Sequence, residues 1–332
     1  MVFDDPFHPF TDPEFEKQAL ALFKYQFENN DVYHSFCTGV KITPDKVKSI
    51  HQIPFLPISF FKTHEVKTTP FIPEIVFRSS GTTGSETSRH FIKSLSLYQK
   101  AYYSSFQFFY GDPYSYTFLA LLPNYLERDD SSLIYMMTDL VQNSASEDSG
   151  FYLYNHEDLY QKLIKLKENG QKTILFGVTF ALLDFVEHFS IDFPDLIVFE
   201  TGGMKGRRKE MVKEEVHTIL TQKLGVPKIH SEYGMCELLS QAYSSGDNLF
   251  NTPPWMKLLL RDEKEPIPSL IDSSFKYTEP TTGAIQVIDF ANLYSCAFIA
   301  TEDLGRRHPN GAIEIIGRLD SARLRGCNLM VI

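Results

Sequence analysis

The sequence predicts an α/β protein with a doubly wound, mostly parallel sheet and a small antiparallel, barrel-like subdomain. Between residues 117 and 230, short apolar strands alternate with helical patterns, which is typical of a parallel sheet covered by helices. After about residue 250, short strands follow one another with few helices. The 332 residues, 43% of them hydrophobic, suffice for one large domain or two smaller ones. We therefore expect an α/β core over residues 1–250 and a closing subdomain over residues 251–332.

The first hundred residues predict helices and extended segments. Apolar residues at helical spacing indicate a helix over residues 13–30, and a second, short helix is expected over residues 43–51. Prolines interrupt the apolar segment 53–62, so that an extended conformation is expected there. A buried strand ends at residues 75–77, and a helix rich in Tyr and Phe is expected over residues 95–110.

The middle and the end of the chain supply the remaining predicted elements. Strands are expected at residues 117–122, 173–177, 196–200, 228–230, 285–289 and 313–316. Helices are expected at residues 156–168, 179–188 and 207–224, the last one ending at Gly225. The segment 129–148, rich in Ser and acidic residues, is expected to be a mobile loop.

Composition excludes several classes of protein. The formal net charge is −10, which argues against a nucleic-acid or an anionic-membrane partner. The N-terminus lacks the apolar stretch of a signal peptide, and no apolar run is long enough to span a bilayer. The four cysteines, Cys37, Cys236, Cys296 and Cys327, show no paired spacing, which argues against a zinc site and a disulfide framework. We expect a cytoplasmic protein with reduced thiols.

Residues 79–85 read Ser-Ser-Gly-Thr-Thr-Gly-Ser and are the most informative segment of the chain. Small residues and glycines let a ligand approach the main chain, and the N–H groups and hydroxyls suit an anion such as a triphosphate. The run follows a predicted strand end, so that it is expected where an α/β sheet presents strand ends to ligands. The Gly-Lys-Ser/Thr of the Walker loop is missing. Taken alone, such a run is as often a solvated loop.

The same run matches the phosphate loop of adenylate-forming enzymes, Ser/Thr-Ser-Gly-Ser/Thr-Thr-Gly, and from this point the chain resembles that superfamily. The resemblance implies that the phosphates of ATP are bound by Ser80, Gly81, Thr82, Thr83 and Gly84. The chain departs from the family at the end of the loop, where Thr87 and Ser88 replace the usual Pro-Lys. The charge of Arg89 is a candidate substitute for the missing lysine.

Two further segments resemble the nucleotide site of the same enzymes. Residues 201–205 place Gly202 and Gly203 after a strand, where a nucleotide base could lie against the main chain, although a plain strand–helix turn is an equal alternative. Residues 231–237 read Ser-Glu-Tyr-Gly-Met-Cys-Glu and resemble the family's Tyr-Gly-x-Thr/Ser-Glu.

For residues 231–237, the resemblance implies that Tyr233 stacks on adenine, with Gly234 beside it, and that Glu237 binds Mg²⁺, a cation that prefers carboxylate and phosphate oxygens. Cys236 stands where the family has a hydroxyl near the α-phosphate. A thiol is a weaker donor than a hydroxyl, so that we interpret Cys236 as a packed structural cysteine.

The ribose and the hinge have candidate residues near the C-terminus. Residues 301–305 resemble the family's Thr-Gly-Asp, which implies that Asp303 accepts the two ribose hydroxyls; an ordinary turn aspartate before Gly305 is the alternative. The resemblance also implies that Arg318, in Gly-Arg-Leu-Asp, contacts the ribose or the phosphates. Relatives continue into a C-terminal lid domain after this hinge. We expect that the lid is absent here, because the chain ends at Ile332.

A narrower resemblance concerns residues 54–62 and 324–330, which are similar to the acyl-protein synthetases, or long-chain-fatty-acid–protein ligases, of bacterial luminescence operons. It implies that Cys327 captures the acyl group as a thioester. A thiolate is a strong nucleophile near neutral pH, and Arg325 could lower the pKa of this thiol. The alternative is a small buried cysteine, since free cysteines are commonly buried.

Together these segments predict an ATP- and Mg²⁺-dependent ligase. It would convert a fatty or other carboxylic acid to an acyl-adenylate, transfer the acyl group to its own cysteine and deliver it to an accepting protein such as a reductase. Glu237, Arg325 and Cys327 are the expected catalytic residues. Two alternatives stay open at this point: an acyl- or aryl-CoA ligase of the phenylacetate type with a missing lid, and a nucleotide-binding partner without turnover.

Overall fold

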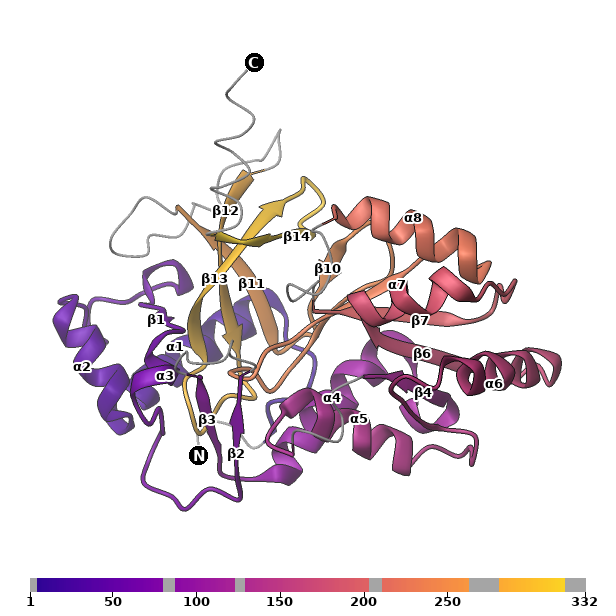
Figure 1. Ribbon diagram of the computed structural model, residues 1–332. Coiled ribbons are helices and arrows are strands. Elements are labelled where there is room, and N and C mark those ends of the chain that lie inside the picture. The colour runs from indigo at the N-terminus through magenta and orange to yellow at the C-terminus, as the bar shows by residue number, and fades with distance from the viewer. Residues whose placement is uncertain (1–4, 80–86, 123–128, 203–210, 263–280, 320–332) are drawn as a thin grey trace. The chain divides into compact units, whose positions relative to one another are not determined.

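The computed structural model describes residues 5–79, 87–122, 129–202, 211–262 and 281–319 (Figure 1). The chain forms two compact units. The first consists of Met1–Ser105, Gly234–Gln241 and Leu249–Ile332, and the second of Phe106–Tyr233 and Ala242–Asn248. The predicted division of the chain near residue 250 stays a prediction.

The second unit contains the parallel sheet that the alternating pattern predicts. Its strands lie in the order β9-β8-β7-β6-β4-β5, and all pairs are parallel except β8 with β9. The strands are β4 (Thr117–Leu121), β5 (Gly150–Tyr152), β6 (Thr173–Val178), β7 (Ile197–Thr201), β8 (His230–Tyr233) and β9 (Ala242–Ser244). The helices are α5 (Ser132–Gln142), α6 (His156–Glu168), α7 (Thr179–His188) and α8 (Lys213–Leu224), with a 3₁₀ turn η2 (Pro113–Ser115).

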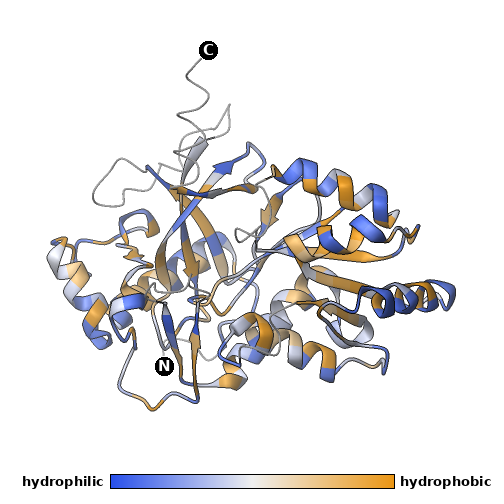
Figure 2. Ribbon diagram, in the orientation of Figure 1, coloured by the Kyte–Doolittle hydropathy of each residue, from blue (hydrophilic) through white to orange (hydrophobic). Residues whose placement is uncertain are grey.

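Burial explains why these segments form a parallel sheet with helices around it. Every residue of β4 and of β6 is buried, as expected for strands that are covered on both faces. In Figure 1, α7 and α8 lie on one side of these strands and α5 on the other, which is the doubly wound arrangement. Figure 2 shows hydrophobic strands and hydrophilic residues along the outer sides of α6 and α8.

The first unit contains an antiparallel sheet in the order β11-β12-β13-β14-β10, with β1 parallel to β13. The strands are β1 (Leu56–Pro57), β10 (Leu249–Asn251), β11 (Met256–Arg261), β12 (Thr281–Asp289), β13 (Phe298–Arg307) and β14 (Ile313–Arg318). The predicted strands at residues 285–289 and 313–316 are therefore confirmed as parts of β12 and β14. A separate hairpin joins β2 (Ile75–Arg78) to β3 (Arg89–Ile92).

Helices near the N-terminus complete the first unit. They are α1 (Asp12–Asn29), α2 (Asp31–Gly39) and the single turn α3 (Phe60–Thr63), with a 3₁₀ turn η1 (Ile50–Gln52). The helix α4 (Leu95–Tyr110) continues from this unit into the second. No helix among the described residues combines the length and the apolar character that crossing a bilayer requires.

Several predictions of single elements were wrong. Residues 129–148 do not form a loop throughout, because they contain α5, whose Met136, Met137 and Leu140 are buried. Residues 43–51 do not form an α-helix, and only η1 is helical there. The helix expected over residues 207–224 begins at Lys213 within the described residues.

The first predicted helix ends slightly earlier than expected, and a second helix follows it that the sequence analysis missed. Buried Asn30 separates the two: its backbone N–H donates to the carbonyl of Gln26 in α1, and its side-chain oxygen accepts from the N–H of Tyr33 in α2. Asparagine is a preferred residue at such a helix start. The spacing of apolar residues predicted one helix over residues 13–30, whereas the buried Asn30 side chain joins two helices.

Candidate functional site

The glycine-rich run connects the two strands of the β2–β3 hairpin. Arg78 and Arg89 are the last pair of the ladder. Beyond them, the N–H of Ser79 donates to the carbonyl oxygen of Ser88 at 3.1 Å, and the N–H of Ser88 donates to Oγ of Ser79 at 2.9 Å. These bonds fix the two ends of the loop. The predicted phosphate ligands Ser80, Gly81, Thr82, Thr83 and Gly84 lie outside the described residues.

The environment of this loop differs from the prediction. The strand that precedes it belongs to a two-stranded antiparallel sheet and not to the parallel α/β sheet. A short apolar strand looks the same in either sheet, because its periodicity reports burial and not its hydrogen-bonding partner. The guanidinium of Arg89, the candidate for the missing lysine charge, lies 5.7 Å from the centre of the Phe91 ring.

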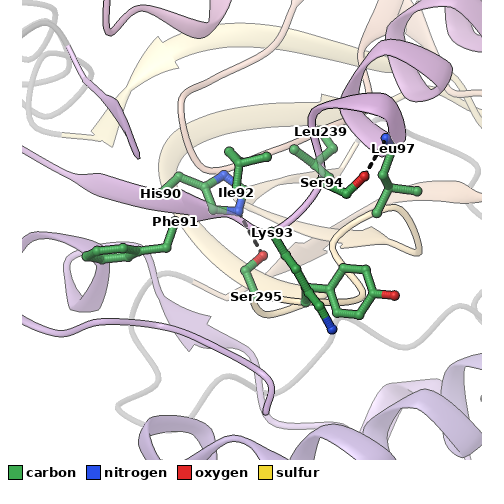
Figure 3. Close-up of a pocket in the computed structure, with 9 residues that line it drawn as sticks. His90, Phe91, Ile92, Lys93, Ser94, Leu97, Leu239 and Ser295 are labelled. Carbon is green, nitrogen blue, oxygen red and sulfur yellow. Dashed lines mark hydrogen bonds between the residues drawn. The ribbon is translucent and has the colours of Figure 1, made fainter. Parts of the chain in front are cut away.

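The segment 234–241, which carries Glu237, is held by buried side chains of the first unit. Nδ1 of His90 lies 2.8 Å from the carbonyl oxygen of Cys236. Nε2 of the same ring lies 2.8 Å from Oγ of Ser295, as Figure 3 shows. Nδ2 of Asn292 donates to the carbonyl oxygen of Glu237 at 2.7 Å. The main chain around Glu237 is therefore fixed on both sides.

Buried Asp289, at the end of β12, holds the rest of this segment. Its carboxylate accepts from the N–H groups of Leu239 (3.2 Å) and Ser240 (2.9 Å) and from the hydroxyl of Ser240 at 2.8 Å. Nε1 of Trp255 also donates to that hydroxyl. Burial raises the pKa of Asp289, and the hydrogen bonds to Ser240 oppose this rise. A fully satisfied buried network of this kind makes a segment rigid.

Glu237 presents a buried carboxyl group close to the base of the hairpin. Its exposed fraction is only 4%. Burial raises the pKa of this carboxyl; a hydrogen bond with Ser88 and the positive charge of Arg318 lower it, and the negative charge of Asp303 raises it. The structure thus brings together Glu237, Asp303 and Arg318, three of the predicted site residues that lie far apart in the sequence.

Asp303 and Arg318 lie opposite one another on β13 and β14. Nη1 of Arg318 is 3.5 Å from Oδ1 of Asp303, and Nη2 is 2.6 Å from Oε2 of Glu302. Asp303 is buried, whereas the Arg318 side chain is 58% exposed. Asp303 is part of a strand and not of a turn, so that the alternative of an ordinary turn aspartate before Gly305 is wrong.

The donor set of this cluster fits a hard cation that is shared with phosphate groups. No group of three or more His, Cys, Asp or Glu side chains among the described residues could hold a metal ion by itself. Mg²⁺ commonly uses one or two carboxylates together with phosphate oxygens and water, so that one buried carboxylate and a neighbouring hydroxyl are a suitable contribution from the protein. Glu237 and Ser88 supply these groups.

The second unit carries a buried polar cluster at the end of β7 and β8 that the sequence analysis missed. Glu200 accepts from the hydroxyls of Thr179 (2.9 Å) and Ser231 (2.6 Å) and pairs with Nζ of Lys213 at 2.8 Å. Burial would raise the pKa of Glu200, but nearby His217 and the charge of Lys213 outweigh it and lower the pKa to about 2.

A second carboxyl group, Glu232, accepts from the hydroxyl of Thr201 at 2.7 Å. Burial and the charge of Glu200 raise the pKa of Glu232 to about 7, although the hydrogen bond from Thr201 lowers it. Two of the predicted nucleotide residues of this unit flank the cluster: Tyr233 is the last residue of β8, and Gly202, which follows β7, has a φ of +70°. Gly203 lies outside the described residues.

Three of the four cysteines belong to the described residues; all three are buried, and no disulfide joins any of them to another. Burial raises the pKa of the Cys37 thiol to about 12 and also raises the pKa of the Cys296 thiol. Cys236 is also buried, two residues after Gly234 in the fixed segment. Cys327 and Arg325, the predicted nucleophile and its neighbour, lie outside the described residues.

Sequence reasoning missed the side chains that hold the segment 234–241: His90, Asp289 and Asn292. A weak signal was present, since each of them is a polar residue beside an apolar strand pattern. Such residues are usually exposed, and only the tertiary structure shows that these three are buried and hydrogen-bonded.

Comparison with known proteins bears on the fold. No protein-family model and no curated protein sequence matches this chain. Among solved structures, it is similar to ATP-bound MatB from Rhodopseudomonas palustris, with a TM-score of 0.51 and 15% identity over 76% of this chain and 50% of that one. It is also similar to an ATP-bound chimera, RpMatB-BxBclM B3, with a TM-score of 0.51 and 16% identity over 75% of this chain and 49% of that one.

The chain therefore spans about half the length of these structures. Their likeness confirms the predicted α/β fold over about three quarters of this chain.

Proposed function

We propose that the protein binds ATP with Mg²⁺ and activates a carboxylic acid as an acyl-adenylate, with release of pyrophosphate. The observation that carries this proposal is the buried Glu237 carboxyl, which the fold brings together with Ser88 at the base of the glycine-rich loop, with Asp303 and with Arg318. The fold shared with two ATP-bound structures supports it.

Each residue of the cluster has a chemical role in this proposal. Glu237 and the Ser88 hydroxyl would hold the cation, whose charge stabilises the negative charge that develops on the phosphates. Asp303 offers carboxylate oxygens that only accept hydrogen bonds, which suits two ribose hydroxyls. Arg318 supplies a positive charge near both carboxyls. The roles of Tyr233 at the base and of residues 80–84 at the phosphates stay predictions.

We further propose that the acyl group is transferred to Cys327 and then to an accepting protein. The Cys327 thiolate would attack the acyl carbon, the carbon–sulfur bond would form, and the anhydride bond would break with AMP as the leaving group. The three described cysteines support this choice by exclusion. All are buried, and the raised pKa values of Cys37 and Cys296 disfavour a thiolate. Fatty acids are the proposed substrate class, on the resemblance of residues 54–62 and 324–330.

Exchange of labelled pyrophosphate into ATP tests the first step. The protein is incubated with ATP, Mg²⁺ and each of a series of acids that range from short aryl acids to long-chain fatty acids. Exchange that depends on one class of acid is expected, and Glu237→Gln should lose it by about 100-fold or more, as for groups that stabilise transition-state charge. Glu314→Gln is the matched control, since Glu314 is a glutamate of the same unit that pairs with Arg306 and His308. ATP binding without exchange for any acid would favour the non-catalytic alternative.

Labelled acid tests the second step. With ATP and Mg²⁺, the wild-type protein is expected to acquire a label that hydroxylamine removes, because a thioester reacts with it readily, and Cys327→Ser should not acquire the label. A product that forms only when coenzyme A is added would favour the CoA-ligase alternative. Pyrophosphate exchange in a wild-type protein that acquires no label would support the adenylation step and exclude self-acylation.

A further inference from the structure

The proposed chemistry assigns no role to His90. This side chain is nevertheless among the most deeply buried polar side chains near Glu237. It is the second residue of β3, and its exposed fraction is 1%. Burial lowers the pKa of His90 to about 4, so that the ring is neutral at physiological pH. Because a carbonyl oxygen can only accept, Nδ1 of the neutral ring is protonated and donates to the carbonyl of Cys236. Nε2 then accepts from the hydroxyl of Ser295, which Figure 3 shows.

The bond from His90 acts on the peptide unit next to Glu237. The carbonyl of Cys236 and the N–H of Glu237 belong to the same planar peptide group, so that holding the carbonyl fixes the plane. On the other side, Asn292 holds the carbonyl of Glu237 itself, at 2.7 Å. The two planes that flank the Cα atom of Glu237 are therefore both anchored, and together they set the direction in which its side chain leaves the main chain.

The same edge of the hairpin also contacts the carboxyl group. Ser88, which hydrogen-bonds with Glu237, precedes His90 by two residues. Side chains two residues apart on an extended chain point to the same side. Ser88 thus contacts the carboxyl group of Glu237, and His90 contacts the peptide group before it, while the backbone of Ser88 closes the glycine-rich loop against Ser79.

We propose that His90 is a positioning residue: through the Cys236 carbonyl it orients the Glu237 carboxylate toward the Ser88 hydroxyl, with which it would hold the cation. This inference rests on the proposed function, because it assigns the use of Glu237 to cation and phosphate binding. His90 itself touches neither ligand. Its contribution is the fixed geometry between two segments that lie 146 residues apart in the sequence.

Titration calorimetry with ATP, in the presence and in the absence of Mg²⁺, tests the proposal in the full chain. The quantity of interest is the gain in ATP affinity that Mg²⁺ gives. His90→Ala is expected to reduce this gain about 10-fold, the usual lower effect of losing a residue that orients a metal ligand, with little change in ATP affinity without Mg²⁺.

Two substitutions of His90 separate its two hydrogen bonds. His90→Asn places an amide N–H near the position of Nδ1 and keeps the bond to Cys236, so that it should restore the gain to within about 3-fold of wild type, on the same scale. His90→Gln reaches the position of Nε2 instead and should behave like His90→Ala. If instead His90→Gln keeps the Mg²⁺-dependent gain in ATP affinity and His90→Asn loses it, the bond to Ser295 is the one that matters and the proposal is overturned.

Folding is controlled by Tyr33→Phe, which removes another buried hydrogen bond of the same unit, from the Tyr33 hydroxyl to the carbonyl of Pro54 at 2.6 Å. This variant should lose thermal stability without any change in the gain. If the Mg²⁺-dependent gain in ATP affinity instead falls in proportion to the melting temperature across all variants, including Tyr33→Phe, His90 is only structural and the proposal fails. If wild type binds ATP but all His90 variants keep the full gain, the inference fails alone. If wild type binds no ATP under either condition, the proposed function and the inference both fall.

Discussion

Asp303 on β13 and Arg318 on β14 are direct partners across an antiparallel ladder, with Nη1 of Arg318 3.5 Å from Oδ1 of Asp303. The Arg318 side chain is 58% exposed, so that this pair contributes at most about 1 kcal/mol to stability. Its interest lies in its position, because both residues act on the pKa of buried Glu237, with opposite signs. Strand pairing thus places three charged groups of the proposed site together.

The first prediction concerns Asp303 and the ribose. Asp303→Asn keeps the shape of the side chain but replaces one acceptor oxygen by a donor. If the carboxylate accepts the ribose hydroxyls, the affinity for ATP should fall by about 10- to 100-fold, the range for hydrogen bonds to a charged group. Calorimetry with ATP and with 2′-deoxy-ATP checks this, since wild type should prefer ATP and the variant should not. Glu302→Gln is the neighbouring control, and an unchanged preference in Asp303→Asn would contradict the assignment.

The second prediction concerns the pH dependence of cation binding. Burial raises the pKa of Glu237, and the charge of Arg318 lowers it. A cation needs the ionised carboxylate, so that the gain in ATP affinity from Mg²⁺ should appear only as pH rises past this pKa. Arg318→Gln removes the charge and should move that onset to higher pH, whereas Arg318→Lys should leave it near wild type. An onset that stays in place or moves to lower pH in Arg318→Gln would show that Arg318 does not act on Glu237.

The third prediction concerns Glu232 and stability. Its pKa is raised to about 7 in the folded state, above the value near 4.3 of an unfolded chain. The folded state therefore favours the protonated form: the stabilisation is complete below pH 4.3 and is lost as pH rises through about 7. Glu232→Gln imitates the protonated group and should lack this loss, gaining on the order of 1–3 kcal/mol relative to wild type between pH 5 and pH 8.

Urea unfolding of both proteins at pH 5 and pH 8 measures this difference. Glu200, whose pKa is lowered to about 2, titrates below this window and does not interfere. Parallel stability profiles for wild type and Glu232→Gln would show that Glu232 does not carry the effect.

The fourth prediction compares two glycines that follow helices of the second unit. Gly170 and Gly225 have φ values of +62° and +63°, which other residues adopt only with strain. A Cβ atom at Gly170 would meet no atom within 4 Å, whereas at Gly225 it would lie 2.5 Å from Cα of Asp192. Gly170→Ala should cost about 1 kcal/mol of unfolding free energy, from strain alone. Gly225→Ala should cost roughly 3 kcal/mol or more, because the backbone of Asp192 must move as well.

Chemical denaturation of both variants checks this ranking. Equal losses would mean that the loop containing Asp192 yields without cost, and that only the backbone conformation of Gly225 matters.

The fifth prediction concerns the reactivity of the thiols. In the folded protein, a neutral alkylating reagent should modify Cys37 and Cys296 very slowly, because both are buried and their pKa values are raised. If Cys327 is the acyl-carrying nucleophile, it should react first, and ATP with a substrate acid should protect it. Peptide mass spectrometry after timed labelling identifies the modified residue, with labelling in urea as the reference for full reaction. Modification of Cys236 before Cys327 would contradict the assignment.

Much of the central sheet could be predicted from the sequence. The helices at residues 156–168 and 179–188 have the predicted bounds, and the helix end at Gly225 is confirmed. These segments are long or continuously apolar, so that their period reports a buried face without knowledge of the rest of the fold. Helix α5 was missed because its neighbours are acidic and rich in Ser, and the composition of the region hid its buried residues.

The candidate site was predicted only in part. Glu237, Asp303 and Arg318 were singled out individually, and the structure shows that they influence one another. The residues that hold Glu237 in place were not predicted. The only signal for His90, Asp289 and Asn292 is a polar residue beside an apolar pattern, and it is weak because a buried polar residue looks like an exposed one until its partners are known.

Most helices and strands of the second unit, and the glycine that ends α8, could be predicted from the sequence, because periodicity and residue type are local properties; α5, β5 and β9 were not predicted. The roles of Glu237, Asp303 and Arg318 stay predictions. Contacts between distant segments show that the strands on either side of the glycine-rich run pair as an antiparallel hairpin, and that Glu237 is held between His90 and Asn292. The physical reason is distance along the chain: these hydrogen bonds join residues that are 146 and 55 positions apart. No local pattern encodes such a partner, and it is fixed only when the strands pair and the core closes around them.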